Sequence, residues 1–176
     1  MKIKLKLLSN LFLMITVLFV AVSCNKTVDN DKKIKEIKNI SVMDYNIVTG
    51  KYVDYDNNGI VSIKPGAPKR LKIYETKSIL LNNGNMLLYQ LDIKTEGLNG
   101  KVYPQISGVI NGITKVSDSY SENITGTSDW KTITAPLLVL NSKSVNNLIL
   151  NLIIEGKGNI WVKNIKILRG FIPVEY

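Results

Sequence analysis

The stretch Leu87–Lys94, with the sequence LLYQLDIK, places an apolar side chain at every second position and mostly polar ones between them. One face carries Leu87, Tyr89, Leu91 and Ile93, and the other carries Leu88, Gln90, Asp92 and Lys94. Because successive side chains of a strand point to opposite faces of its sheet, the pattern predicts a strand with one buried and one wetter face. The same pattern returns at Leu148, Leu150, Leu152 and Ile154, whereas the apolar run 137–140 predicts a strand buried on both faces.

Turn signals separate these apolar runs at short intervals. They are Asn57-Asn58-Gly59, Asn83-Gly84, Asn99-Gly100, Asn111-Gly112, Thr125-Gly126-Thr127 and Gly156-Lys157-Gly158. Asn-Gly pairs suit the positive φ angles of hairpin turns, so we expect the chain to reverse at them. The stretch 64–70 contains two prolines and predicts a loop. Since no long helical period lies between the turns, the sequence predicts an all-β sandwich.

Residues 1–23 have the order of a secretory signal. Three lysines precede the almost uncharged run 7–20, which is short for a membrane-spanning helix, and small residues follow. The segment resembles the bacterial lipoprotein signal, whose final motif ends in a cysteine that becomes the first mature residue. Val22-Ser23-Cys24 fit that motif, although Ala21 stands where the family prefers leucine. The resemblance implies lipid attachment at Cys24, and the alternatives are an ordinary cleaved signal or an uncleaved membrane helix.

Residues 24–33 are predicted to be a lipidated cysteine with a polar tether, and residues 34–176 to be one folded domain. The lipoproteins of enteric bacteria carry an aspartate after the cysteine for inner-membrane retention. Asn25 stands there instead, so the resemblance implies the outer membrane. Residues 1–23 hold three of the 23 basic side chains and none of the 14 acidic ones, which leaves 20 basic side chains and an excess of six. Such a charge is compatible with anionic headgroups or acidic glycans, but a solvated surface is the simpler interpretation.

The chain contains no histidine, which excludes Ser-His-Asp triads, His-containing zinc sites and imidazole bases. Asp92, Asp118, Glu122 and Asp129 show no spacing that fixes the carboxylate pair of a glycosidase. There is no phosphate-binding glycine motif, and no basic run interleaved with aromatic residues. We therefore predict that the protein is not an enzyme and has no nucleic-acid partner.

Three segments resemble, in order and spacing, carbohydrate-binding modules of the galactose-binding-like jelly-roll family. They are 88–95 (LYQLDIKT), 126–131 (GTSDWK) and 158–165 (GNIWVKNI), and the similarity covers residues 45–168. The resemblance implies one β-sandwich jelly roll. The last strand of these modules commonly carries an aspartate that helps hold a structural calcium ion, but Lys163 stands there, beside Asn164. Because an ammonium group cannot ligate calcium, Lys163 disfavours that site, and no cofactor is expected.

Trp130 and Trp161 lie within these packing motifs, so we expect core or sheet-edge positions for them rather than a sugar-stacking role. Better ligand candidates follow from the phase of the next strand. If Val102 and Ile106 face the core, Tyr103 and Gln105 face outward, across a predicted hairpin at 96–100 from Gln90 and Asp92. The candidate ligand-binding residues are Gln90, Asp92, Tyr103, Gln105 and Tyr120, the last as a lid over the cleft.

The residue types at this predicted face suit carbohydrate recognition, because a tyrosine ring stacks on sugar C–H groups and amides bond sugar hydroxyls. The first hypothesis is an outer-membrane lipoprotein that displays a non-catalytic binding domain for a glycan or an envelope polysaccharide. The second is a structural or antigenic surface lipoprotein that contacts proteins and binds no sugar. An ordinary solvated sheet face would accompany the second hypothesis.

Overall fold

The structure is a computed structural model, and it describes residues 34–41, 44–45, 51–81 and 85–171. The signal segment, Cys24, the tether and Asn83-Gly84 lie outside the described residues. The described strands are β1 (Lys35–Asn39), β2 (Val53–Tyr55), β3 (Val61–Ile63), β4 (Arg70–Leu80), β5 (Met86–Ile110), β6 (Ile113–Asp118), β7 (Ile124–Leu138) and β8 (Ser144–Gly170), with a short 3-10 helix η3 (Tyr120–Glu122) before β7. Within these ranges, no helix has the length and apolar character needed to cross a membrane.

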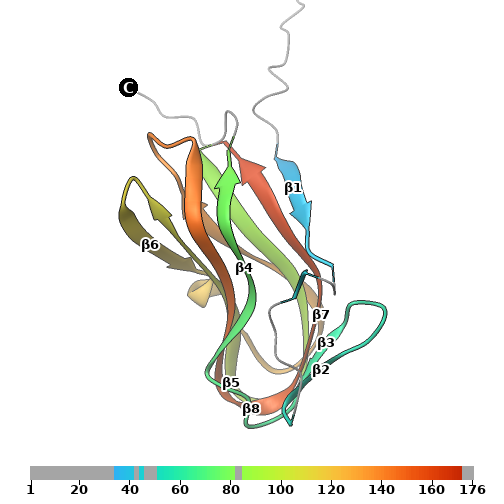
Figure 1. The fold of residues 1–176 in the computed structure, drawn as a ribbon. Helices are drawn as coiled ribbons and strands as arrows, with labels where there is room; N and C mark the ends of the chain where they lie inside the picture. Colours follow the sequence, from blue (N-terminus) through green and yellow to red (C-terminus); the bar gives the residue numbers. More distant parts are fainter. Residues whose placement is uncertain (1–33, 42–43, 46–50, 82–84, 172–176) are drawn as a thin grey trace, which may run out of the picture. The chain divides into compact units, whose positions relative to one another are not determined.

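The strands form a single antiparallel sheet that folds back on itself (Figure 1). β5 and β8 pair along almost their whole lengths, and both bend where Gly100 lies opposite Gly156. On one side of the bend, β4, residues 144–155 of β8, residues 101–110 of β5 and β6 lie in that order, and we call this the β4 layer. On the other side, β7, residues 86–96 of β5 and residues 159–170 of β8 continue into β1, β3 and β2, and we call this the β7 layer. The protein is therefore an all-β sandwich of the jelly-roll type, as predicted.

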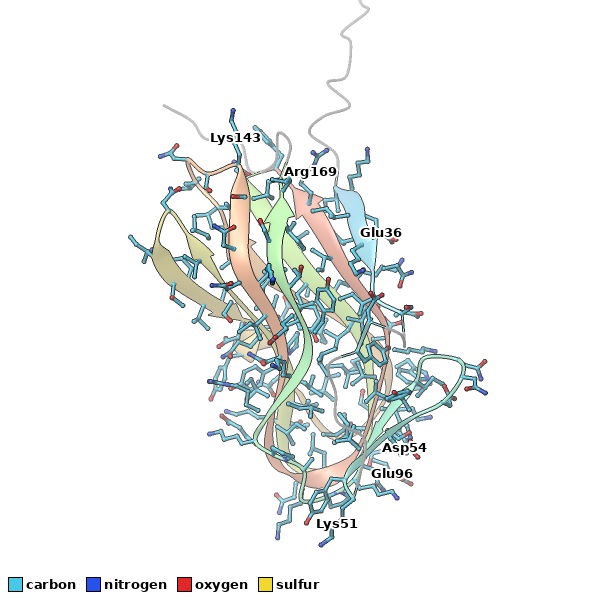
Figure 2. All side chains as sticks on the ribbon, viewed as in Figure 1. Glu36, Lys51, Asp54, Glu96, Lys143 and Arg169 are labelled. Carbon is cyan, nitrogen blue, oxygen red and sulfur yellow. The ribbon has the colours of Figure 1, made fainter. Side chains whose placement is uncertain are left out.

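The core lies between the two layers, where side chains fill the sandwich (Figure 2). Leu87, Tyr89, Leu91 and Ile93 enter it from the β7 layer, and Leu148, Leu150, Leu152 and Ile154 enter it from the β4 layer. Both predicted alternations are thus confirmed. Burial of this continuous apolar surface is the main source of stability, since each fully buried aliphatic side chain contributes about 1.5–3 kcal/mol relative to an exposed one.

Some of the predicted turn signals are turns between strands, and others are bends or distortions within continuous strands. Asn111-Gly112 joins β5 to β6 with φ angles of 51° and 78°, which is the predicted hairpin turn. Asn57-Asn58-Gly59 is also a turn, between β2 and β3, and the stretch before β4 is a loop, as predicted. The reversal predicted at Asn99-Gly100 is wrong, as are those at Gly126 and at Gly156-Lys157-Gly158, because β5, β7 and β8 run through these positions. The positive φ angles of Gly100, Gly126 and Gly156 bend or distort continuous strands there.

The prediction of two-sided burial for residues 137–140 is also wrong. Leu137 and Val139 are buried, whereas Leu138 and Leu140 are exposed. β7 contributes to one layer of a two-layer sandwich, and within the described residues nothing packs over its outer face at this end. An uninterrupted apolar run therefore belongs here to an ordinary half-buried strand.

Candidate functional site

The outer face of the β4 layer carries the predicted tyrosine and glutamine. Val102 and Ile106 of β5 are fully buried in the core, so Tyr103 and Gln105 point to the opposite face, as predicted. Their partners across the sheet are Ile153 and Asn151 of β8, respectively. A cavity of about 390 Å³ lies on this face and is lined by Tyr103, Gln105, Ile153, Lys69, Arg70 and Glu155. We call this cavity the first hollow of the groove.

Two amides lie on the floor of this groove. Gln105 and Asn151 are only 9% and 6% exposed, and Asn151 Nδ2 donates a hydrogen bond of 3.4 Å to Gln105 Oε1. Among the described residues, Gln105 Nε2 and Asn151 Oδ1 make no further hydrogen bond. Nearly buried amides usually have their donors and acceptors satisfied. In this pair, the amino group of Gln105 and the carbonyl of Asn151 have no partner among the described residues, so they can bond a ligand or water.

Glu155 fixes one end of the groove. Its carboxylate accepts a hydrogen bond of 3.2 Å from the Tyr103 hydroxyl and lies 3.2 Å from Lys101 Nζ and 3.4 Å from Lys69 Nζ. The bond from Lys101, with further bonds from Lys69 and Tyr103, holds the pKa of the Glu155 carboxyl below its ordinary value. Burial and the contact with Glu155 raise the pKa of Tyr103. At neutral pH the site therefore contains an ionised carboxylate and a neutral, fixed tyrosine.

Tyr120 lies next to the groove, because it packs against Tyr103. It belongs to η3, which is tied to β5 by the hydrogen bond from the Ser119 amide to the Pro104 carbonyl. The Tyr120 ring packs edge-on against Tyr103, with 5.4 Å between the ring centroids, and half of its surface is exposed. Lys101 donates a hydrogen bond to the Tyr120 hydroxyl and places its Nζ 3.7 Å from the ring centroid. The structure therefore places Tyr120 next to Tyr103, and its predicted role as a lid stays a prediction.

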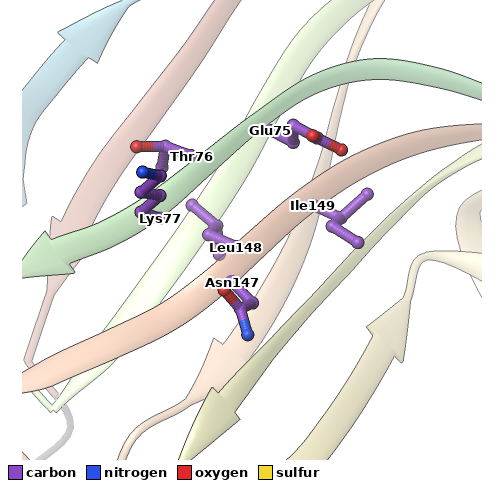
Figure 3. A pocket seen from close by; sticks show the side chains of 6 residues that line it. All are labelled: Glu75, Thr76, Lys77, Asn147, Leu148 and Ile149. Carbon is purple, nitrogen blue, oxygen red and sulfur yellow. The ribbon is translucent and has the colours of Figure 1, made fainter.

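A second hollow extends the groove along β4 and β8. It has a volume of about 430 Å³ and is lined by Glu75, Thr76 and Lys77 of β4 and by Asn147, Leu148 and Ile149 of β8 (Figure 3). Glu75 lies opposite Ile149, and Lys72 lies opposite Asn151, so the amide floor separates the two hollows along the same strands. The groove, as we define it, comprises both hollows and the Gln105–Asn151 floor.

Gln90 and Asp92 do not belong to the groove, contrary to the prediction. Because β5 bends rather than reverses near residue 100, these side chains lie on the outer face of the β7 layer. Gln90 Nε2 donates to Thr134 Oγ1 at 3.3 Å. Asp92 accepts hydrogen bonds of 2.6 Å from Thr132 Oγ1 and from Asn164 Nδ2. The Asp92 carboxylate thus serves to join three neighbouring strands.

The residues near Asp92 do not fit a calcium ion. Lys163 Nζ lies 4.1 Å from the Trp130 ring centroid, and Asn164 turns the donor nitrogen of its amide toward Asp92. A search of the described residues finds no cluster of three or more carboxylate, histidine or cysteine side chains able to hold a metal. Calcium requires several oxygen ligands, which this arrangement does not supply.

Trp130 and Trp161 are not core residues, which corrects part of the prediction. Both are half-buried on the outer face of the β7 layer and are absent from the core cluster. Trp130 does lie on a sheet-edge strand, since β7 pairs only with β5 in the described residues. The alternation around Trp161 was the signal in the sequence, because buried Ile160 and Val162 leave the residue between them on the outer face.

The ionisation of Glu155 is expected to make stability depend on pH. Because its folded-state pKa is lowered, Glu155 stabilises the fold fully above the ordinary pKa of 4.5, and the contribution is lost as pH falls through the folded value. Urea unfolding of wild type and Glu155→Gln at about pH 6 and about pH 3 measures this effect. The stability difference between the two proteins should shrink at the lower pH, and a difference that stays constant would contradict an ionised Glu155.

Neither a family model nor a curated protein matches this chain. Among solved structures, it resembles a CBM22-1 xylan-binding domain from Paenibacillus barcinonensis, with 12% identity over 80% of this chain and 95% of that domain, and a TM-score of 0.48. A family 29 carbohydrate-binding module is 21% identical over 79% of this chain and 90% of its own, with a TM-score of 0.46.

The chain also matches a Clostridium thermocellum xylanase fragment that joins a CBM22-1 module to a GH10 module. That match has 12% identity and a TM-score of 0.46, and it covers 80% of this chain and 26% of the fragment. This chain thus spans about a quarter of the longer protein. The solved structures to which it is similar in fold therefore include carbohydrate-binding modules.

Proposed function

We propose that this protein binds carbohydrate without catalysis, in the groove of the β4 layer, and that lipid at Cys24 anchors it to a bacterial outer membrane. The observation that carries the binding proposal is the amide pair on the groove floor. Gln105 and Asn151 are almost buried yet share a single long hydrogen bond. Their free amino group and carbonyl are not among the enclosed unpaired atoms of the described residues, so they are open to a ligand that replaces water.

Sugar hydroxyls supply the partners that this amide pair lacks. A hydroxyl both donates and accepts, so neighbouring hydroxyls of one ring can accept from Gln105 Nε2 and donate to Asn151 Oδ1. The exposed part of the Tyr120 ring offers an apolar surface for sugar C–H groups next to Tyr103, which lines the first hollow. The groove thus combines planar amides with a neighbouring aromatic ring, which is the chemistry that carbohydrate recognition uses.

The second hollow favours an extended ligand over a single sugar. It continues along β4 and β8 beyond the amide floor, and Glu75, Lys77 and Asn147 supply polar groups on its lining. A linear oligosaccharide lying along these strands would contact both hollows. We therefore expect affinity to rise with chain length from one sugar to several.

The electrostatics of Glu155 support binding rather than hydrolysis. Glycoside hydrolysis needs a carboxylic acid with a raised pKa that protonates the leaving oxygen. Hydrogen bonds from Lys101 and Lys69 instead lower the pKa of Glu155, the carboxylate that lines the first hollow. Its role is to orient Tyr103 and the two lysines.

The membrane part of the proposal rests on the sequence of residues 1–24. A basic start, a short apolar run and a terminal cysteine are the features of a lipoprotein signal. Several acyl chains on Cys24 would give stable membrane residence, which one chain alone does not. Membrane fractionation of wild type and Cys24→Ser tests this part separately from sugar binding.

A polysaccharide screen tests the binding proposal. The full chain in mild detergent is screened against soluble xylan, β-glucan, mannan and bacterial envelope polysaccharides, and any hit is titrated by calorimetry. We expect Gln105→Leu and Tyr120→Ala each to weaken the hit about tenfold or more, because about 1–2 kcal/mol of polar or stacking contact is removed.

Tyr55→Ala provides the matched control. Tyr55 is likewise an exposed tyrosine packed edge-on against another tyrosine, Tyr45, at a centroid distance of 5.8 Å, but it lies on β2 of the other layer. It should bind as wild type does. A folded protein that binds no polysaccharide, or groove variants that bind as tightly as wild type, would overturn the proposal and favour a surface lipoprotein that contacts proteins.

A further inference from the structure

We propose a second binding site, for acidic oligosaccharides, in the tryptophan pocket on the outer face of the β7 layer. This pocket is a cavity of about 540 Å³ whose lining includes Lys94 and Glu96 of β5, Asp129 and Trp130 of β7, and Trp161 of β8. It lies toward the end of the sandwich where β5 and β8 bend, near Glu96 (Figure 2). It is separate from the groove, since the core lies between the two outer faces.

The register of the sheet places a lysine between the two tryptophans. Lys94 lies directly opposite Trp161 in the β5–β8 pairing, and Trp130 lies on β7, the strand on the other side of β5. Trp161 and Trp130 therefore flank Lys94 on the same face. Both indoles are partly exposed, and neither contributes to the core. Two partly exposed indoles on the strands that flank β5 form an apolar surface of the kind that marks a ligand site.

Two ammonium groups accompany the indoles. Lys163 Nζ lies 4.1 Å from the Trp130 ring centroid and has no ion pair among the described residues. Lys94 Nζ lies 3.7 Å from Asp129 Oδ1, but the Asp129 side chain is 87% exposed, so this pair is weak and readily exchanged. Asp92, the register partner of Lys163 on β5, is already held by Thr132 and Asn164. The cations thus remain available to an incoming anion.

The two indoles and the two ammonium groups together select the class of ligand. A uronate or sulfated sugar presents C–H groups that stack on an indole and an anion that pairs with Lys94 or Lys163. A neutral sugar would gain no charge pairing from Lys94 or Lys163, and a small inorganic anion would not use the indoles. Glu96 and Asp129 in the lining add negative charge, which weakens the positive electrostatic potential around the pocket. Binding of an anion therefore depends on direct contact with the two lysines.

Intrinsic fluorescence isolates this site, because Trp130 and Trp161 are the only tryptophans in the chain. The full chain in detergent is titrated with oligogalacturonate, with the same oligosaccharide fully methyl-esterified, and with sulfated heparin oligosaccharides. We expect a saturable change in tryptophan emission with the two acidic ligands and none with the neutral ester. Raising the salt from about 50 mM to about 500 mM should weaken the acidic ligands, since exposed charge pairs are screened.

Matched lysine variants separate a built site from general attraction. Lys94→Gln with Lys163→Gln should weaken acidic binding about tenfold or more, whereas Lys115→Gln with Lys143→Gln, which removes the same charge elsewhere, should not. Equal effects of the two pairs, or no change in emission with acidic ligand, would overturn the proposal. Tyr120→Ala should leave the emission change intact, so failure of the groove and failure of this pocket are distinguishable.

Discussion

Replacing Gly100 with alanine is expected to lower the free energy of unfolding by more than about 3 kcal/mol, or to prevent folding. A Cβ atom at this position would lie 1.8 Å from the Glu155 carbonyl oxygen, which belongs to the backbone of β8 and cannot rotate away. The φ angle of Gly100, 132°, is also strained for any other residue. Gly156 faces the same constraint from the other strand, with a Cβ position 1.9 Å from the Asn99 carbonyl oxygen. Urea unfolding followed by circular dichroism measures the loss.

Gly97→Ala is the control that separates the steric clash from the backbone angle. Gly97 lies in the same region of β5 with a φ angle of 59°, but a Cβ atom there would meet nothing within 4 Å. Its substitution should cost only about 1–2 kcal/mol, the usual cost of the left-handed conformation. Equal losses for Gly97→Ala and Gly100→Ala would show that the close approach of β5 and β8 does not hold the bend.

The bend explains which parts of the fold the sequence could predict. Alternation is local, so the strand faces at Leu87–Lys94 and at 148–154 were correctly assigned. An Asn-Gly pair indicates a positive φ angle, but it does not show whether the chain reverses there. Positive φ angles occur in the hairpin turn at Asn111-Gly112 and also at Gly100, where β5 bends and continues. The difference depends on the partner strand, since Gly100 lies opposite Gly156, far away in the sequence. No local pattern contains that pairing.

The candidate site was predictable to the same extent. Tyr103 and Gln105 followed from the phase of one strand, and Tyr120 was chosen because it lies on a polar segment that could close over the cleft. Gln90 was misplaced because the predicted hairpin would have brought it onto the same face. Asn151 lies between two of the alternating leucines of β8 and so faces away from the core. Its contact with Gln105 arises from the β5–β8 register, which only the folded chain reveals.

Lys163 has a contact in the structure that the sequence alone did not indicate. In the sequence, this lysine only argued against calcium. In the fold, its ammonium group lies over the ring of Trp130, on the open face of the β7 layer. Lys163 thus places a cation beside an indole, and the proposed acidic ligand depends on that pairing.

Leu137→Ala is expected to lower the free energy of unfolding several-fold more than Leu138→Ala, although the two leucines are neighbours in the sequence. Leu137 is 2% exposed and packs in the core, whereas Leu138 is 47% exposed on the outer face of β7. Truncating the buried leucine removes apolar contacts and leaves a cavity, which costs about 2–5 kcal/mol. The exposed leucine should cost less than about 0.5 kcal/mol, as surface substitutions usually do. Chemical denaturation of both variants measures the difference. Similar large costs would mean that something covers the outer face of β7, and similar small costs would mean that β7 does not pack as described.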